Sequence, residues 1–162
     1  MRTRTVIEEL TQEDLSNFFS TALYMSEIFD ARYNKKKWHH IFLPSDCFED
    51  KLAKILLSGG TIDIIDCFAE DKEDIHNKDL GRWVKTGCDS HSYEAVYTIS
   101  LKDIEAGLSN AADGSFKTCE CESYDWAYKV IAAMKSMDVD YDQSDAELIL
   151  QIICFKEHVY EC

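Results

Sequence analysis

The sequence contains a single proline and only six glycines among its 162 residues. Linkers between domains are commonly rich in these residues, so their scarcity argues against a long flexible connection within the chain. The length fits one domain, because domains commonly hold about 100–200 residues. With 46% hydrophobic and 12% aromatic residues, the chain can bury a core of its own. We therefore predict a single domain over residues 1–162.

Long apolar segments are absent as well. No run of apolar residues approaches the roughly 18 that a membrane crossing requires. The first ten residues, MRTRTVIEEL, contain two arginines but no apolar core behind them, which is not the form of a secretory signal. We expect a cytoplasmic protein that has no membrane partner. Its seven cysteines should then be free thiols, with Cys67 and Cys154 in the core because both lie in apolar segments.

Basic side chains are scarce: 17 Lys and Arg stand against 31 Asp and Glu, which gives a net charge of −14. Residues 1–40 hold six of each sign, so residues 41–162, with 11 basic and 25 acidic side chains, carry the whole excess. Binding of nucleic acid through its phosphates needs clustered Lys and Arg, so we expect no direct nucleic-acid partner. The acidic surface either keeps the protein soluble or engages a basic partner, and both interpretations stay open.

Catalytic signature motifs are also lacking. The chain has no nucleophile elbow, P-loop, zincin helix or dinucleotide-binding glycine motif. His39 and His40 are adjacent, and neighbouring side chains diverge on a helix or a strand, so they do not form a ligand pair. Cys88 and His91 are spaced as a thiol–imidazole pair but have no evident orienting group. We predict no catalytic residue and no cofactor, and we do not expect an enzyme.

Two groups of residues resemble metal sites without meeting their requirements. Asp138, Asp140 and Asp142 occupy positions 1, 3 and 5 of a calcium loop, but Gln143 stands at the glycine position and Ile149 at the glutamate position. We interpret this stretch as the acidic start of a helix. The candidate zinc ligands are Cys88, His91, Cys119 and Cys121. Cys-x-Cys is tighter than the usual ligand spacing, so we predict no metal, although their convergence stays an open question.

Helix starts are the clearest local signals in the sequence. Four segments pair a capping residue with an acidic residue three positions later, followed by apolar residues at helical spacing. The pairs are Thr11 with Asp14, Asp46 with Glu49, Ser100 with Asp103, and Ser144 with Glu147. Another apolar stripe predicts a fifth helix over residues 123–137.

Two segments have the alternation of strands. Residues 61–68 (TIDIIDCF) place Ile62, Ile64 and Phe68 on one face, and residues 93–100 (YEAVYTIS) alternate in the same way. Two strands alone are marginal, so we expect a further strand from residues 4–9 (RTVIEE) or 158–162 (HVYEC). The predicted fold class is α+β, with about five helices packed on a small antiparallel sheet.

The loop of residues 69–92 between these strands is the best place for a binding surface. It is 24 residues long and opens with acidic residues, and structureless loops beyond about 12–15 residues are commonly functional. The simpler interpretation is a crossover packed down by Leu80, Trp83 and Val84. An alternative is a small enzyme or metal-binding protein that uses this loop, with His76, Cys88 and His91 as its candidate residues.

Two segments resemble known sequences: residues 97–112 (YTISLKDIEAGLSNAA) and 144–160 (SDAELILQIICFKEHVY). They resemble small acidic proteins of Bacteroides-type conjugative transposons and phages, as do residues 5–24 and 46–64. The shared motifs are caps, apolar stripes and a polar Gln151. The resemblance implies an accessory protein of a mobile element and implies no activity. Lys156 and Glu161 stand where such proteins have small residues or glycine.

We therefore predict a non-enzymatic protein that binds a protein partner, with a DNA-binding protein as the partner that its charge favours. A DNA mimic or antirestriction-type inhibitor is one form of that role. The oligomeric state stays open. The predicted partner-binding residues lie in the long loop and before the last helix: Glu70, Asp71, Glu73, Asp74, Asp79, Trp83, Asp138, Asp140, Asp142 and Asp145.

Overall fold

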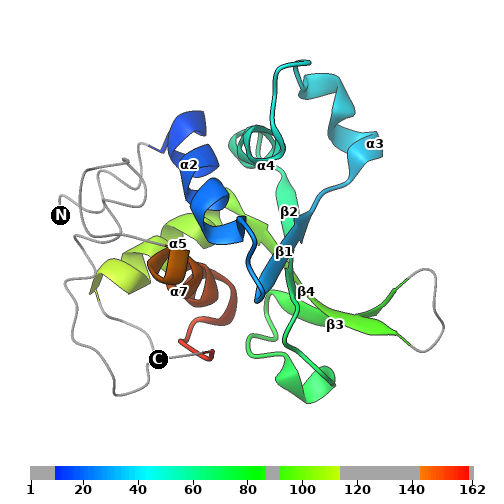
Figure 1. Cartoon of the computed structure of the whole chain (residues 1–162), viewed down its shortest axis with the longest axis vertical. Coiled ribbons are helices and arrows are strands. Elements are labelled where there is room, and N and C mark those ends of the chain that lie inside the picture. Colours follow the sequence, from blue (N-terminus) through cyan, green and yellow to red (C-terminus); the bar gives the residue numbers. More distant parts are fainter. Residues whose placement is uncertain (1–9, 87–91, 114–142, 161–162) are drawn as a thin grey trace.

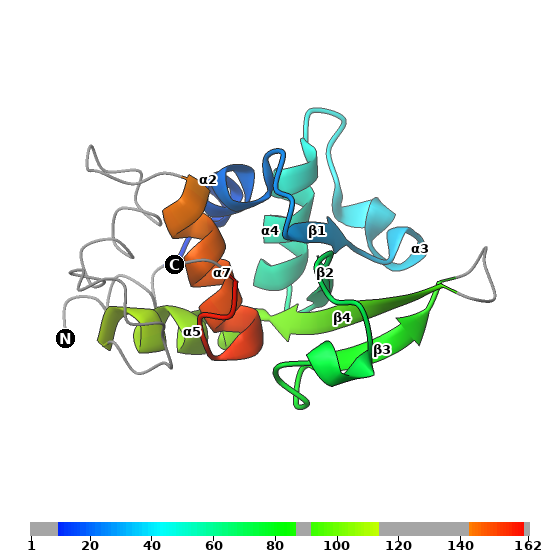
Figure 2. The same cartoon turned by 60° about the horizontal axis from the view of Figure 1, so that its bottom comes forward.

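The structure is a computed structural model that describes residues 10–86, 92–113 and 143–160. These residues form an α+β fold, as predicted, with five α-helices and a four-stranded antiparallel sheet among them (Figures 1 and 2). In chain order the elements are α2 (Gln12–Leu23), β1 (Phe29–Arg32), α3 (Lys35–Trp38), the 3-10 turn η1 (His39–Ile41), α4 (Phe48–Leu57), β2 (Thr61–Asp66), the 3-10 turn η2 (Lys72–Asp74), β3 (Gly81–Lys85), β4 (Tyr93–Ser100), α5 (Leu101–Asp113) and α7 (Gln143–Phe155). The predicted helix over residues 123–137 lies outside the described residues.

The strand order in the sheet is β1-β2-β4-β3. The two predicted strands form its centre, where Thr61 pairs with Ser100 and Asp66 with Ala95. From β2 the chain runs through η2 to the edge strand β3 and returns to the centre as β4. The β3–β4 hairpin projects beyond the helices in both views of the cartoon (Figures 1 and 2).

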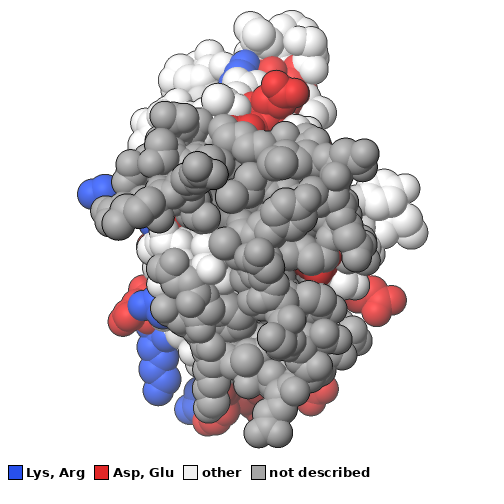
Figure 3. Space-filling view, turned by 90° about the vertical axis from the view of Figure 1, so that its left-hand side faces the viewer, with Lys and Arg blue, Asp and Glu red and all other residues white. Residues whose placement is uncertain are grey.

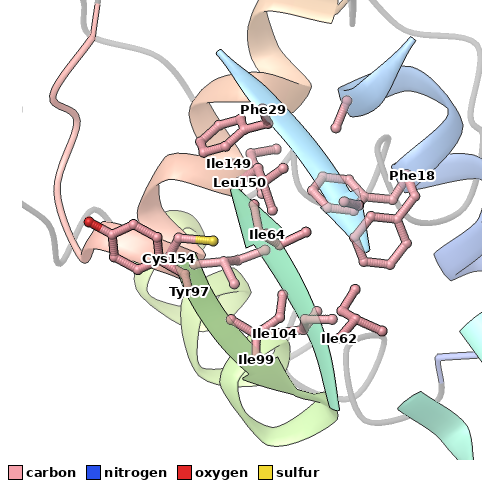
Figure 4. Packing of buried hydrophobic residues seen from close by; sticks show 14 of the residues in the cluster. Phe18, Phe29, Ile62, Ile64, Tyr97, Ile99, Ile104, Ile149, Leu150 and Cys154 are labelled. Atoms are coloured by element: carbon pink, nitrogen blue, oxygen red, sulfur yellow. The ribbon is translucent and has the colours of Figure 1, made fainter. Parts of the chain in front are cut away.

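The helices α2, α4, α5 and α7 supply the core that lies on one face of the sheet. The period-2 alternation of β4 places Ala95, Tyr97 and Ile99 in this core, all fully buried. Figure 4 shows how the helices and strands meet there through Phe18, Phe29, Ile62, Ile64, Tyr97, Ile99, Ile104, Ile149, Leu150 and Cys154. At roughly 25 cal/mol per Å² of apolar surface, burial of this cluster is the main stabilising term of the fold.

Two of the four predicted helix caps are present. Thr11 and Asp14 bond each other's backbone N–H groups at the start of α2. Ser100 and Asp103 do the same before α5, as the sequence predicts. In both cases the side chains satisfy N–H groups that have no partner inside the helix.

The other two predicted caps are wrong. α4 is capped one residue later, because the Asp50 carboxylate accepts from Cys47 N–H while Asp46 accepts from Leu43 N–H and Lys54 Nζ. Ser144 lies inside α7 rather than before it. Glu147 accepts a 2.5 Å hydrogen bond from Ser26 Oγ, so its carboxylate joins α7 to the turn before β1.

The two strands that complete the sheet are β1 and β3, and neither was predicted. Residues 158–160 form no strand, and residues 4–9 lie outside the described part of the chain. β1 and β3 are edge strands of four and five residues, and each pairs on one side only. β1 does alternate, with Phe29 and Ala31 buried, but a run of four or five residues is too short for its alternation to stand out in the sequence.

The β2 prediction extends too far. The strand ends at Asp66, where the carboxylate accepts from Phe68 N–H at 2.9 Å and turns the chain. Phe68 and Cys67 therefore leave the buried face and are exposed, contrary to the core positions predicted for them. Cys154 is buried in α7 as expected, and Cys47, Cys67 and Cys154 are free thiols.

α5 and α7 approach each other at Gly107. A methyl group on this glycine would lie 2.5 Å from Cγ1 and 2.6 Å from Cα of Ile153, closer than carbon atoms pack. The missing side chain is therefore what allows α5 to lie against the backbone of α7. This contact positions the last turn of α7, and with it the site described next.

Candidate functional site

The predicted acidic loop contains a turn that is bound to itself, residues 70–74, here called the acidic turn. The Asp74 carboxylate accepts from the N–H groups of Glu70 and Asp71 at 2.7 and 3.2 Å. These two hydrogen bonds lower the pKa of Asp74. Asp71 in turn accepts from Glu73 N–H at 2.9 Å. Two carboxylates thus fix the backbone, and Glu70, Asp71 and Glu73 are exposed on it.

Two further predicted residues of this loop lie beyond the turn. Asp79 is exposed and forms a 3.6 Å ion pair with Lys156. Trp83 lies on β3, where its ring stacks on Tyr93 at 6.1 Å with an interplanar angle of 8°. Both views place the η2 turn beside β3 (Figures 1 and 2), so the acidic turn lies next to the strand that carries Trp83. Residues 81–85 of the predicted loop are strand, because they pair with β4.

The acidic residues predicted near the last helix do not join this group. Asp145 lies in the first turn of α7, whereas Asp79 pairs with Lys156 just after its last turn. Asp145 and Lys156 are eleven positions apart, which corresponds to about 16 Å along a helix, so Asp145 lies far from Asp79. Asp138, Asp140 and Asp142 lie outside the described residues. On the side shown in Figure 3, acidic and basic side chains of the described residues lie next to one another at the lower end.

Buried polar side chains converge on a second place, which we call the polar junction. The described residues contain four such side chains, Asp14, Asp66, Asn77 and Gln151. All but Asp14 bind the end of α7 or the segment that follows it. Asn77 donates to the carbonyl of Cys154 at 2.9 Å. Gln151 accepts from the N–H groups of Val159 and Tyr160 at 2.9 and 2.8 Å and donates to the carbonyl of Tyr160 at 3.1 Å.

Titratable side chains contact one another in a row through this junction. Tyr160 Oη donates to Asp66 Oδ2 at 2.7 Å, and His76 Nε2 lies 3.3 Å from Tyr160 Oη. His76 Nδ1 lies 4.0 Å from Glu157 Oε1, and the backbone N–H of His76 donates to Tyr97 Oη at 2.9 Å. These contacts connect β2, the loop after η2, β4 and the segment after α7.

Burial controls the ionisation of these groups. It raises the pKa of the Asp66 carboxyl, against which the hydrogen bonds from Tyr160 Oη and Phe68 N–H act. It also raises the pKa of the Tyr160 phenol, with the Asp66 carboxylate acting in the same direction, and that of the Tyr97 phenol. Both phenols are therefore neutral at physiological pH and serve as hydrogen-bonding groups.

The sequence gives no sign of the polar junction. Gln151 is a polar residue among apolar ones and His76 lies in the long loop, but nothing in the spacing joins them to Asp66 and Tyr160. The pairs are separated by up to 94 positions in the chain. The one local signal was a glutamine with apolar residues on both sides, which must find partners when it is buried.

The metal-site alternative finds no support in the described residues. They contain no group of three or more His, Cys, Asp or Glu side chains arranged to hold a metal ion. Cys88, His91, Cys119 and Cys121 lie outside them. His76, the remaining candidate of the enzyme alternative, packs its ring against Phe155 and Tyr160 at 5.1 and 5.8 Å.

A shallow hollow of about 250 Å³ lies between the turn before β1 and the start of α7. It is lined by Met25, Ser26, Glu27, Ile28, Phe68, Gln143 and Glu147. The Ser26 hydroxyl in this hollow is already hydrogen-bonded: its Oγ donates to Glu147 and accepts from the N–H groups of Ile28 and Phe29. The serine therefore orders the turn and is not arranged as a nucleophile.

The sheet face opposite the core carries paired charges. Arg32 of β1 forms two hydrogen bonds, at 2.7 and 2.6 Å, with the carboxylate of Glu94 on β4. Asp63 accepts from Thr98 Oγ1 at 2.7 Å and lies 3.8 Å from Arg82. These pairs tie both edge strands to the centre of the sheet.

Comparison with protein-family models, with curated proteins and with solved structures finds no match for this chain. Within the described residues, no helix combines the length and apolar composition that a membrane crossing requires.

Proposed function

We propose that this protein acts without catalysis, by binding another protein through the acidic turn and the β3–β4 hairpin beside it. The observation that carries the proposal is the self-bound backbone of the acidic turn. Asp71 and Asp74 use their carboxylates to fix that backbone, which holds Glu70 and Glu73 on an exposed, ordered surface. A surface that is ordered before binding loses less conformational entropy on association.

The neighbouring hairpin supplies the other component of a protein interface. Trp83 and Tyr93 stack there, and Tyr93 is 47% exposed. Arg82 precedes Trp83 on the same strand and faces the other side of the sheet, where it pairs with Asp63. Tryptophan and tyrosine are among the residues that most commonly dominate binding energy, whereas surrounding charges set the rate and specificity of association.

The partner that this surface fits is a protein with a basic patch, and a DNA-binding protein is the class that the net charge of −14 favours. Asp145 and Asp79 lie at opposite ends of α7, which favours a local charge contact over a long DNA-like stripe. The proposal includes antirestriction-type inhibition, in which this protein would cover the basic surface that its partner uses to bind DNA. The resemblance to proteins of conjugative transposons implies an accessory role in a mobile element, which is part of this proposal.

Affinity capture from cells of the native host tests the proposal. The bait is the full chain, in wild-type form and with Glu70→Gln and Glu73→Gln, which remove two exposed charges and leave Asp71 and Asp74 in place. Glu13→Gln with Glu27→Gln is the matched control, because it removes two exposed charges elsewhere. We expect a basic protein to be recovered with the wild type and the control and lost with the double variant. Identical recovery by all three baits would refute the proposal.

A further inference from the structure

The edge of the sheet at β1 is closed by side chains of its own chain. The register of β1 with β2 directs the N–H groups of Phe29 and Ala31 away from the sheet. Ser26 Oγ accepts from the N–H of Phe29 at 3.1 Å, and the Asp30 carboxylate accepts from the N–H of Ala31 at 2.8 Å. These bonds occupy the donors with which another strand would pair.

The edge at β3 has the same alternation. Leu80 and Thr86, which flank β3, hydrogen-bond to the chain opposite them with N···O distances of 3.1 and 3.0 Å. Because bonded residues alternate in an antiparallel pair, Gly81, Trp83 and Lys85 direct their N–H and C=O groups away from β4.

Only the first of these three N–H groups is bonded within the described residues. Gly81 N–H donates to the carbonyl of Asn77 at 2.8 Å, so the loop after η2 closes the start of the strand. The N–H groups of Trp83 and Lys85 have no hydrogen-bond partner in the part of the chain that the structure describes. The hairpin end of β3 also projects beyond the helices and the η2 turn (Figures 1 and 2). This edge is therefore open to another strand.

We propose that the strand which fills this edge is β3 of a second copy of the protein, paired antiparallel about a two-fold axis at Val84. In this register Trp83 and Lys85 of one copy exchange backbone hydrogen bonds with Lys85 and Trp83 of the second copy. The two sheets then become continuous. This inference is independent of the proposed partner binding, because the acidic turn takes no part in the pairing.

The open donors select this register. An axis at Arg82 or at Trp83 would pair Gly81, whose N–H is already bonded to Asn77. An axis at Lys85 would set two lysines directly opposite each other, which is unfavourable. The axis at Val84 pairs both open residues and sets unlike side chains opposite each other.

The side chains complement each other in the same register. Trp83 stands opposite Ala95 and Lys85 opposite Tyr93, all on one face of the sheet, and the Trp83 ring stacks on Tyr93 at 6.1 Å. Lys85 of the second copy would lie beside the Trp83 ring, where its stem can pack and its ammonium can interact with the ring. An edge lysine commonly opposes pairing, but here it meets an aromatic ring instead of another charge.

The opposite face of the strand contributes an apolar contact on the axis. Val84 is half-buried in one copy and would pack against Val84 of the second copy. The strand has only five residues and the copies carry a net charge of −14 each, so the dimer should be weak. We expect a Kd of about 10–100 μM at about 0.5 M salt, where the repulsion is screened.

Sedimentation of the full chain between about 1 and 500 μM tests the inference, because this range brackets the expected Kd. Val84→Asp and Val84→Lys each place like charges on the axis, so each variant alone should dimerise about tenfold more weakly than the wild type. A mixture of the two should recover association to within about threefold of the wild type, because opposite charges then meet. Leu57→Asp, at another partly exposed apolar residue, is the matched control and should dimerise as the wild type does.

Amide hydrogen exchange of the wild type supplies a readout that needs no variant. Protection of the Trp83 and Lys85 N–H groups should rise by about threefold or more as the concentration passes the Kd, because these groups become bonded. The N–H of Val84, which bonds to β4, is the internal reference and should change less.

Three results would overturn the inference. The first is a wild type that stays monomeric over the whole concentration range. The second is a dimer that Val84→Asp and Leu57→Asp weaken equally, or that the mixture of Val84 variants does not restore. The third is a dimer in which protection of Trp83 and Lys85 does not change with concentration, because the contact would then lie on another surface.

Discussion

Tyr160 and Asp66 meet across 94 positions of the chain in a 2.7 Å hydrogen bond between the phenol and a carboxylate that is 2% exposed. The carboxylate ends the central strand β2, and the phenol lies after the last helix. Because an ionised carboxylate inside a protein needs donors, this bond couples the segment after α7 to the sheet.

Removal of the phenol oxygen should therefore destabilise the fold. Tyr160→Phe keeps the ring contacts but takes one donor from Asp66, and we expect a loss of about 1–3 kcal/mol in the free energy of unfolding. Urea unfolding at neutral pH measures it. Tyr24→Phe, at a residue that is 71% exposed, is the control and should change the free energy by less than about 0.5 kcal/mol. Equal stability of the two variants would contradict the assigned hydrogen bond.

The raised pKa of Asp66 predicts a pH dependence of stability. Protons bind this carboxyl more tightly in the folded state, so its contribution is largest at acid pH and is lost as the pH rises from its ordinary value of 3.8 through the raised pKa. Asp66→Asn removes this titration. We expect the stability of the wild type relative to Asp66→Asn to fall between about pH 4 and pH 7, measured by thermal unfolding. A relative stability that rises over this range would mean that the carboxyl pKa is lowered instead.

The part of the fold that depends on local pattern was predictable. The capping pair of Thr11 and Asp14 and the alternation from Tyr93 to Ser100 are each contained within a few residues, and both are present. The cap at Asp46 was misplaced by one residue, because Asp50 offers the same carboxylate one position later and also accepts from Ser16 of α2. Competition between neighbouring acidic residues is decided by such tertiary partners.

The polar junction could not be predicted for a different reason. Asp66, His76, Gln151 and Tyr160 are brought together by the sheet register and by the packing of α7, which are properties of the whole fold. Among the predicted surface residues, the acidic turn lies beside β3, the strand that carries Trp83, whereas Asp145 lies in the first turn of α7. Exposure of a charged loop can be inferred from sequence, but its neighbours in space cannot.

A side chain at Gly107 should lower the free energy of unfolding. The added methyl group of Gly107→Ala would meet Cγ1 and Cα of Ile153, and overpacking of this kind costs about 1–3 kcal/mol. The gain of about 1 kcal/mol from the better helix former offsets part of this cost. We expect a net loss of about 1 kcal/mol in chemical denaturation. Because Ile153→Ala removes Cγ1, the double variant should be more stable than the sum of the two single changes predicts. Strict additivity would contradict the contact.

Lys156 should be improved by glycine. Its φ of +63° is a conformation that glycine adopts without strain. We expect Lys156→Gly to raise the free energy of unfolding by about 0.5–1 kcal/mol. Lys156→Ala is the control, because it removes the ion pair with Asp79 but keeps a side chain at this backbone conformation. The prediction fails if glycine and alanine give the same stability.

The affinity of the captured partner for the purified protein tests the central claim most directly. Calorimetry at two salt concentrations should show that Glu70→Gln with Glu73→Gln weakens binding by about tenfold at low salt and by less at high salt, because exposed charges are screened. The control variant Glu13→Gln with Glu27→Gln should bind as the wild type does. If the double variant binds with the wild-type Kd at both salt concentrations, the acidic turn is not the binding surface.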